Sequence, residues 1–288
     1  MTAAMTAAAI PAALSRIAAF ADAGKGGNPA GVLIADAMPP EAEMQRIAAA
    51  VGYSETAFAM PEGDRWRVRY FSPEAEVPFC GHATIALGAA LAAQEGDGTF
   101  PLRINGGDIS VEGRAVAGGV EAALISPPSG HRYAAPQDVA AALALFGLSR
   151  ADLVEGPAPV IANAGNDHLV LILKDRARLA AMDYDLAAGA AFMRGLGLTT
   201  ISLLWAEGPR RFHSRNAFAI GGVLEDPATG AAAAALGGWL RDAGLLEGGE
   251  IEIVQGEDMG AKSRLTVSLD GPKGAGLRVA GAARTIAG

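Results

Sequence analysis

The sequence has a single cysteine and four histidines among its 288 residues. The histidines stand at positions 82, 131, 168 and 213, which is not a paired metal-ligand spacing, and no Cys-x-x-Cys pair is present. One cysteine cannot form an internal disulfide, so a reducing, cytoplasmic location is expected. From these absences, we expect no metal ion and no structural zinc in this protein.

Basic side chains and long apolar runs are also scarce. The 23 Lys and Arg against 31 Asp and Glu give a net charge of −8, and no basic run is present. A nucleic-acid partner is therefore not expected. No uncharged apolar stretch approaches the ~20 residues of a membrane-spanning helix, so no membrane partner is predicted. With 51% hydrophobic and 19% charged residues, the chain is predicted to fold.

Cofactor motifs are missing as well. The glycine-rich stretch 24–31, GKGGNPAG, lacks the third glycine of a dinucleotide loop and the Gly-Lys-Ser/Thr of a P-loop. No Gly-x-Ser-x-Gly nucleophile elbow occurs. The sequence therefore indicates no nucleotide or nicotinamide cofactor.

The local patterns predict short strands alternating with helices. Residues 1–15 are Ala-rich and uncharged, with no Lys or Arg before Arg16, and are expected to form a flexible extension. Apolar spacing and a Gly52 stop predict a helix after Pro40, and a second helix is expected near 139–146. Strands are expected near residues 17–20, 31–35, 65–71, 169–173, 201–205, 217–220 and 265–269.

An internal repeat is the most informative pattern. Residues 76–91 and 225–240 align without gaps at an offset of 149, with eight identities in sixteen positions. A second echo pairs GNPAGVLI (27–34) with GNDHLVLI (165–172). Duplication is the economical explanation. With the turn cluster SPPSG at 126–130 as boundary, it predicts domains at 16–128 and 129–275, with 276–288 expected to return to the first.

The repeated unit suggests where chemistry resides. Gly81 and Gly230 stand at expected helix starts, where free N–H groups attract a carboxylate; the alternative is that both are ordinary buried helix starts. The first copy places Cys80 and His82 around its glycine, and the second places Asp226 and Thr229. The helix dipole would keep His82 neutral and able to relay a proton, unless it only caps the helix.

Two acidic residues have similarly open interpretations. Asp226 could simply satisfy N–H groups of the second helix. Glu55 begins an apolar strand, where a carboxylate is a candidate base, although a surface Glu in a turn is the commoner case.

Five motifs together resemble the PhzF-like phenazine-biosynthesis isomerase family: GGNPAGV (26–32), YSETAF (53–58), RYFSPEAEVPFCGHATIALG (69–88), FHSRNAFA (212–219) and EDPATGAAAAALG (225–237). The resemblance implies an α+β fold of two pseudo-symmetric diaminopimelate epimerase-like domains, each a mixed sheet wrapped around a central helix. It also implies a cofactor-free isomerase with its site in the interdomain cleft, often as a homodimer.

The resemblance implies roles for individual residues. It makes Glu55 the proton-transferring base, His82 its partner and Asp226 a substrate-positioning acid. The residues expected to contact a small carboxylate-bearing substrate, similar to dihydro-hydroxyanthranilate, are Asn28, Cys80, Gly81, Thr229, Gly230 and Ala231.

Three positions depart from related sequences. Thr229 stands where related epimerases carry a second cysteine, which makes two-thiol epimerisation improbable, since a Thr hydroxyl is far too weak an acid. Ala231 replaces a common Ser, and GAKS (260–263) replaces Gly-Arg-Pro-Ser, which affects the choice of substrate. The alternatives are a single-thiol racemase or epimerase using Cys80, and a non-enzymatic protein that binds a small acid.

Overall fold

The computed structural model describes residues 10–117 and 119–287. Of the extension expected at 1–15, residues 1–9 lie outside the described residues. Ile10 and the buried Leu14 pack against a core cluster that includes Met44 and Phe58, and the first strand begins at Ser15. The apolar side chains of this segment therefore contribute to the core.

The chain divides into two compact units. The first unit comprises the residues through Ala19, Pro29–Leu124 and the residues from Ala282, and the second comprises Phe20–Asn28 and Ile125–Gly281. Compared with the predicted domains, residues 20–28 belong to the second unit and those from 282 to the first. No helix of the described residues is long and apolar enough to cross a membrane.

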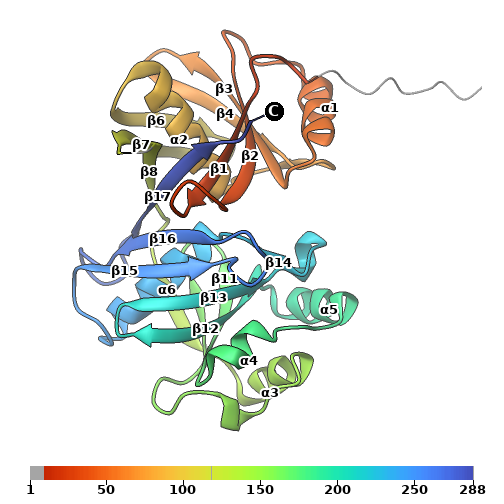
Figure 1. The fold of residues 1–288 in the computed structure, drawn as a ribbon, viewed down its shortest axis with the longest axis vertical. Coiled ribbons are helices and arrows are strands. Elements are labelled where there is room, and N and C mark those ends of the chain that lie inside the picture. Colours follow the sequence, from red (N-terminus) through yellow and green to blue (C-terminus); the bar gives the residue numbers. More distant parts are fainter. Residues whose placement is uncertain (1–9, 118, 288) are drawn as a thin grey trace, which may run out of the picture. The chain divides into compact units, whose positions relative to one another are not determined.

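The elements of the first half of the chain alternate strands with two helices (Figure 1). They are β1 (Ser15–Ala21), β2 (Asn28–Ile34), α1 (Glu41–Val51), β3 (Glu55–Glu62), β4 (Arg65–Phe71), β5 (Glu76–Val77), α2 (Gly81–Glu95), β6 (Gly98–Ile104), β7 (Gly107–Val116) and β8 (Gly119–Ile125). The predicted helix after Pro40 is confirmed, and Gly52 ends it in the left-handed conformation, with φ 72°.

In the second half of the chain, strands again alternate with helices, and the helices are more numerous. Its elements are β9 (Gly130–Tyr133), α3 (Pro136–Leu145), η1 (Arg150–Asp152), β10 (Val160–Asn163), β11 (Asp167–Leu173), α4 (Arg176–Ala180), α5 (Leu186–Leu196), β12 (Thr200–Gly208), β13 (Arg211–Ala217), η2 (Ala219–Gly221), β14 (Glu225–Asp226), α6 (Gly230–Asp242), β15 (Glu250–Gln255), β16 (Ser263–Ser268) and β17 (Arg278–Thr285).

Both units build their sheets in the same order. In the first unit β2 runs parallel to β3, β3 is antiparallel to β4, β4 pairs with both β5 and β6, and β6 pairs with β7. In the second unit the identical sequence of pairings joins β11, β12, β13, β14, β15 and β16. The two mixed sheets are therefore topological copies, as the internal repeat predicts.

The helices of the repeat, α2 and α6, are buried by their own sheets. α2 contacts β3, β6 and β7, and α6 contacts β9, β10, β11 and β16. A Cβ added at Gly88 would lie 2.5 Å from a methyl carbon of Val111, and one at Gly237 would lie 2.8 Å from Val267. The shared glycine thus lets each helix approach its sheet closely.

One predicted strand is wrong. Residues 217–220 are not a strand, because β13 ends at Ala217 and Ala219–Gly221 form a 3-10 turn. The apolar run FAI ends in Gly221 and Gly222, and Gly222 has the positive φ of 78° that turns the chain toward β14.

Candidate functional site

Glu55, Cys80 and His82 form one cluster in the first unit. Glu55 is the first residue of β3, Cys80 precedes α2, and His82 is the second residue of that helix. A Glu55 carboxylate oxygen lies 3.4 Å from His82 Nε2, and Cys80 Sγ lies 3.3 Å from His82 Nδ1. The imidazole therefore stands between the carboxylate and the thiol.

The side chains of this cluster differ in their exposure to solvent. The His82 side chain is 8% exposed and that of Glu55 is 18% exposed, so the carboxylate keeps access to solvent while its partner is buried. Ser54 Oγ lies 3.3 Å from His82 Nε2. A carboxylate that is partly open and backed by a buried imidazole can exchange a proton with a small molecule.

A buried chain of hydroxyls fixes the start of α2. The Thr84 hydroxyl donates to the Cys80 carbonyl at 2.7 Å and lies 2.7 Å from the Tyr70 hydroxyl. Tyr70 is 1% exposed, and burial raises the pKa of its phenol, which stays neutral. The helix start that carries Cys80 and His82 is thereby tied to β4.

A paired Arg and Glu precede each of the two helices. Arg69 contacts both carboxylate oxygens of Glu76, at 2.7 and 2.6 Å, and Arg215 contacts both oxygens of Glu225 in the same two-pronged manner. Each pair ties β4 or β13 to the short strand that leads into the helix. Glu76 and Glu225 match in the repeat, but sequence reasoning gave them no role, because their arginines lie on neighbouring strands.

A second cluster, in the second unit, surrounds Asp226. The Asn28 side-chain amide donates to one Asp226 carboxylate oxygen at 2.8 Å, and the Thr229 hydroxyl donates to the other at 2.5 Å. Asn28 also donates to the Ala228 carbonyl at 3.1 Å. Both oxygens of Asp226 are therefore oriented by neutral donors.

Gln255, which sequence reasoning missed, holds this loop together. Its side chain donates to the Asp226 carbonyl at 2.7 Å and to the Thr229 hydroxyl at 3.0 Å. Its carbonyl oxygen accepts from Thr229 N–H and from Asn216, each at 3.2 Å. Gln255 is 1% exposed at the end of an apolar strand, and a buried polar residue in that position is the signal that could have identified it.

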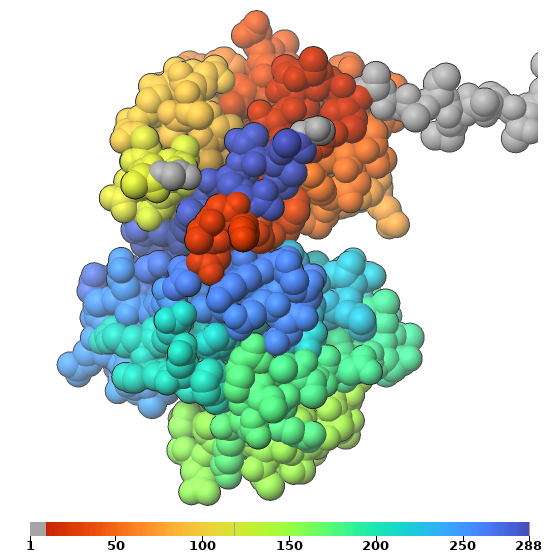
Figure 2. Space-filling model, viewed as in Figure 1, coloured from red at the N-terminus to blue at the C-terminus, as the bar shows by residue number. Residues whose placement is uncertain are grey.

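A tight turn presents Asn28 to this cluster. Gly27 N–H donates to the Lys262 carbonyl at 3.2 Å, and a Cβ added at Gly26 would lie 2.0 Å from that oxygen. In Figure 2 this red turn lies on the blue surface of later residues. Gly26 has a φ of +59°, so only glycine satisfies both the backbone angle and the close approach.

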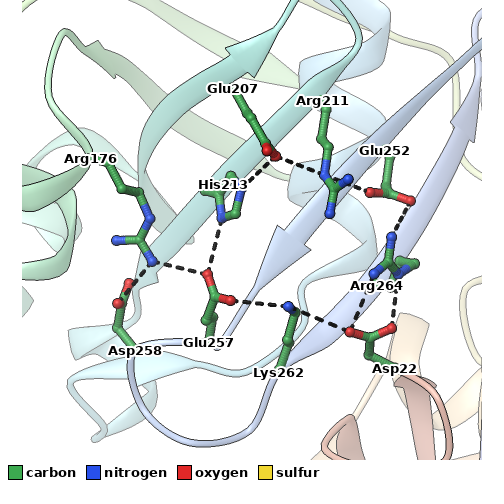
Figure 3. Close-up of polar contacts among 10 residues, drawn as sticks. All are labelled: Asp22, Arg176, Glu207, Arg211, His213, Glu252, Glu257, Asp258, Lys262 and Arg264. Atoms are coloured by element: carbon green, nitrogen blue, oxygen red, sulfur yellow. Dashed lines mark hydrogen bonds and ion pairs between the residues drawn. The ribbon is translucent and has the colours of Figure 1, made fainter.

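Ion pairs fasten the same turn. Arg264 donates to Asp22 at 2.9 Å, and Lys262 lies 3.7 Å from it, at one end of the network in Figure 3. The hydrogen bond from Arg264 is the largest cause that lowers the pKa of Asp22. Lys262, one of the positions that depart from the family pattern, thus contributes to holding the turn before Asn28.

The two copies have diverged at equivalent positions. Strand register pairs Ala30 with Glu55 in the first unit and His168 with Thr200 in the second, so Thr200 occupies the place of Glu55. By the alignment of the repeat, Asp226, Thr229 and Ala231 correspond to positions 77, 80 and 82. The candidate base therefore belongs to one copy and the oriented carboxylate to the other.

The predicted site residues fall into two groups. Glu55, Cys80, Gly81 and His82 lie together in the first unit, and Asn28, Asp226, Thr229, Gly230 and Ala231 lie together in the second. Gly81 and Gly230 are the first residues of α2 and α6, as predicted. Nothing lies within 4 Å of a Cβ added at Gly81, whereas one at Gly230 would contact Phe20 at 3.4 Å.

Known proteins provide an independent comparison. A family model described as phenazine biosynthesis-like protein matches residues 17–288. The chain is 33% identical over 276 residues to an uncharacterized isomerase of Deinococcus radiodurans, covering 89% of this chain and 86% of that protein. It is 32% identical over 259 residues to a trans-2,3-dihydro-3-hydroxyanthranilate isomerase of Pseudomonas fluorescens, covering 88% and 89%.

Solved structures agree with this result. The crystal structure of a PhzF-family phenazine biosynthesis protein from Bacillus anthracis aligns with a TM-score of 0.83 and 23% identity, covering 95% of this chain and 96% of the other. The likeness confirms the predicted α+β fold with two pseudo-symmetric epimerase-like domains. This chain therefore belongs to the phenazine biosynthesis-like protein family, a family of isomerases.

Proposed function

We propose that this protein is a cofactor-independent isomerase that moves a proton within a small carboxylate-bearing substrate resembling dihydro-hydroxyanthranilate. Glu55 removes the proton from one substrate atom and returns it to another, so the product is an isomer and the enzyme is unchanged. The observation that carries the proposal is the partly open Glu55 carboxylate, 3.4 Å from the buried His82 imidazole.

His82 assists the base in this proposal. Its Nε2 is the atom nearest the Glu55 carboxylate, and a neutral ring that donates from this nitrogen would steady the carboxylate between the two transfers. The start of α2 at Gly81 offers free N–H groups beside the base, and these suit the carboxylate of a substrate.

Asp226 is proposed to be a substrate-positioning acid. Its two oxygens already accept from Asn28 and Thr229, which fixes the plane of the carboxylate. An oriented acceptor of this kind suits an amino or hydroxyl group of the substrate. The similarity to a trans-2,3-dihydro-3-hydroxyanthranilate isomerase suggests this class of compound as the first to test.

One observation favours a second candidate, a single-thiol racemase. Cys80 Sγ lies 3.3 Å from His82 Nδ1, so the imidazole could activate the thiol in place of the carboxylate. The two candidates differ in which side chain removes the proton, and a pair of substitutions separates them.

The test compares Glu55→Gln with Cys80→Ala. The assay follows trans-2,3-dihydro-3-hydroxyanthranilate and related small acids in deuterated buffer by NMR. Removal of a general base costs about 10²- to 10⁴-fold in rate, so Glu55→Gln should nearly abolish conversion while Cys80→Ala retains most of it. Glu74→Gln, at an exposed acid of the same unit, is the matched control. The reverse ranking would establish the thiol mechanism instead. A homodimer and a cytoplasmic location stay predictions.

A further inference from the structure

We propose that Glu55, Cys80 and His82 also form a binding site for a thiophilic divalent cation such as Zn²⁺, and that the bound cation blocks the base. One donor atom from each residue lies within 4.8 Å of the other two. The three residue types are among those that bind zinc in proteins.

The distances allow a single ion once the His82 ring turns toward it. Cys80 Sγ lies 3.9 Å from His82 Nε2, and the nearest Glu55 oxygen lies 3.4 Å from the same nitrogen. Zinc bonds of about 2.0–2.3 Å in a tetrahedron separate neighbouring ligand atoms by roughly 3.3–3.6 Å. The Glu55–His82 edge already has the length of a zinc site, whereas the Cys80–His82 edge must shorten by a few tenths of an ångström. Because Cys80 Sγ faces Nδ1 and the Glu55 carboxylate faces Nε2, the imidazole must also turn so that one ring nitrogen points at the shared ion. The Cys80 and Glu55 donor atoms lie within 4.8 Å of each other and close on the same ion.

The charges of the cluster also match. A carboxylate and a thiolate together cancel the two positive charges of the ion, and a neutral imidazole adds none. Cys80 and His82 are buried, and a buried cation is tolerated only when nearby anions compensate it.

The donor set predicts selectivity. Thiolate and imidazole favour Zn²⁺, Cd²⁺ and Co²⁺, whereas Mg²⁺ and Ca²⁺ require several oxygen ligands. Glu55 supplies one carboxylate at this cluster and the nearby Ser54 a hydroxyl, fewer oxygen side chains than Mg²⁺ prefers, so physiological Mg²⁺ should not compete. Three protein ligands leave one coordination position for water or a substrate carboxylate.

Sequence spacing could not reveal this site. Cys80 and His82 are separated by one residue, and the third ligand comes from 25 residues earlier in the chain, at the start of β3. The proposed site differs from the expectation of no metal ion, which was drawn from cysteine and histidine spacing.

A histidine–carboxylate cluster of the second unit serves as the control. In the second unit His213 lies 3.1 Å from Glu207 and 3.2 Å from Glu257. Arg211 contacts Glu207, and Lys262 contacts Glu257 (Figure 3). These carboxylates are already neutralised and the cluster has no thiol, so it should not produce a cobalt–thiolate signal.

The test uses Co²⁺ as a spectroscopic probe of the purified full-length protein under reducing, oxygen-free conditions. Binding through Cys80 should produce a near-ultraviolet thiolate-to-cobalt charge-transfer band that saturates at one ion per chain and is displaced by Zn²⁺. Cys80→Ala should abolish the band, and His82→Gln should weaken binding by about 10- to 100-fold or more. His213→Gln should change neither. Circular dichroism confirms that each variant is folded.

Two results would overturn the proposal: no charge-transfer band in the unaltered protein, or an unchanged Co²⁺ affinity in folded Cys80→Ala. The blocking of the base rests on the proposed function, and it predicts that Zn²⁺ stops substrate conversion while a chelator restores it. Full activity with Zn²⁺ bound would refute the blocking. A protein that binds Co²⁺ through Cys80 but converts no substrate would count against the proposed isomerase and leave the metal site intact.

Discussion

The Asn28 side-chain amide donates to the Asp226 carboxylate at 2.8 Å, across 198 residues of sequence. Asn28 is 2% exposed, and its second hydrogen bond, to the Ala228 carbonyl, uses its other N–H. The first glycine-rich turn of the chain therefore orients the carboxylate that precedes α6. The echo of this motif at residues 165–168 retains Asn166, but replaces the following Pro-Ala with Asp-His.

Substitution of Asn28 should show what this orientation contributes. We expect Asn28→Ala to lower the free energy of unfolding by about 1–2 kcal/mol, because it removes two buried hydrogen bonds and leaves their acceptors unpaired. Asn28→Asp should cost more at neutral pH than at pH 4, since it places a second carboxylate beside Asp226. Urea unfolding at both pH values measures this, and equal losses would contradict the contact.

Gln255 should govern the rigidity of the loop before α6. Gln255→Ala removes the acceptor of the Thr229 N–H and the donor to the Asp226 carbonyl. The backbone amide of Thr229 should therefore exchange with deuterium at least tenfold faster. A tenfold increase corresponds to a loss of about 1.4 kcal/mol in local stability. In the proposed reaction, KM should rise more than kcat falls. Gln94→Ala, at an exposed position of α2, is the control for both measurements. Unchanged exchange at Thr229 would show that Gln255 does not hold the loop.

The two Arg–Glu pairs should differ in their importance for stability. The Arg215 and Glu225 side chains are 11% and 6% exposed, whereas those of Arg69 and Glu76 are 19% and 24% exposed. Removal of one partner from a buried pair costs about 3–5 kcal/mol, because a charge stays buried without compensation. We expect Arg215→Met to approach that loss and Arg69→Met to cost clearly less. Urea unfolding tests the ranking, which equal or reversed losses would refute.

His168 should make the protein less stable in mild acid. It is fully buried, and burial lowers its pKa from 6.5 to about 4. Between these values the unfolded chain binds the proton and the folded chain does not, so the free energy of unfolding falls as pH drops from 6.5 toward 4. Each unit of pKa difference corresponds to about 1.4 kcal/mol.

Replacement of this histidine should remove that dependence. We expect His168→Gln to have a flatter stability profile than the unaltered protein between pH 6.5 and 4, whatever its stability at pH 7. His131→Gln changes an exposed histidine and should leave the profile as it was. Urea midpoints at half-unit pH steps would show the difference. A profile that stays equally steep in His168→Gln would assign the acid sensitivity to other groups.

Local sequence signals predict much of the fold. The helix at Glu41–Val51 and the strand at Arg65–Phe71 follow from apolar periodicity and a glycine stop, which act within one element. The repeat predicts the matching starts of α2 and α6, because the same backbone turn was copied twice. These features depend on residues close to one another in sequence.

The features that escaped prediction depend on strand register. The partners of Glu76 and Glu225 are fixed by the way β4 and β13 pair with neighbouring strands. Gln255 meets Thr229 only because the end of β15 lies beside the start of α6. Motif resemblance named Glu55 and His82, but the thiol beside them forms a ligand set only through the parallel course of β2 and β3 and the turn into α2.

The discontinuous units also constrain how the protein can be divided into fragments. The second unit needs residues 20–28 as well as Ile125–Gly281, whereas the first unit needs Pro29–Leu124 and the residues from Ala282. No contiguous fragment contains either unit alone, and a truncation before Ala282 would leave the first unit without its part of β17.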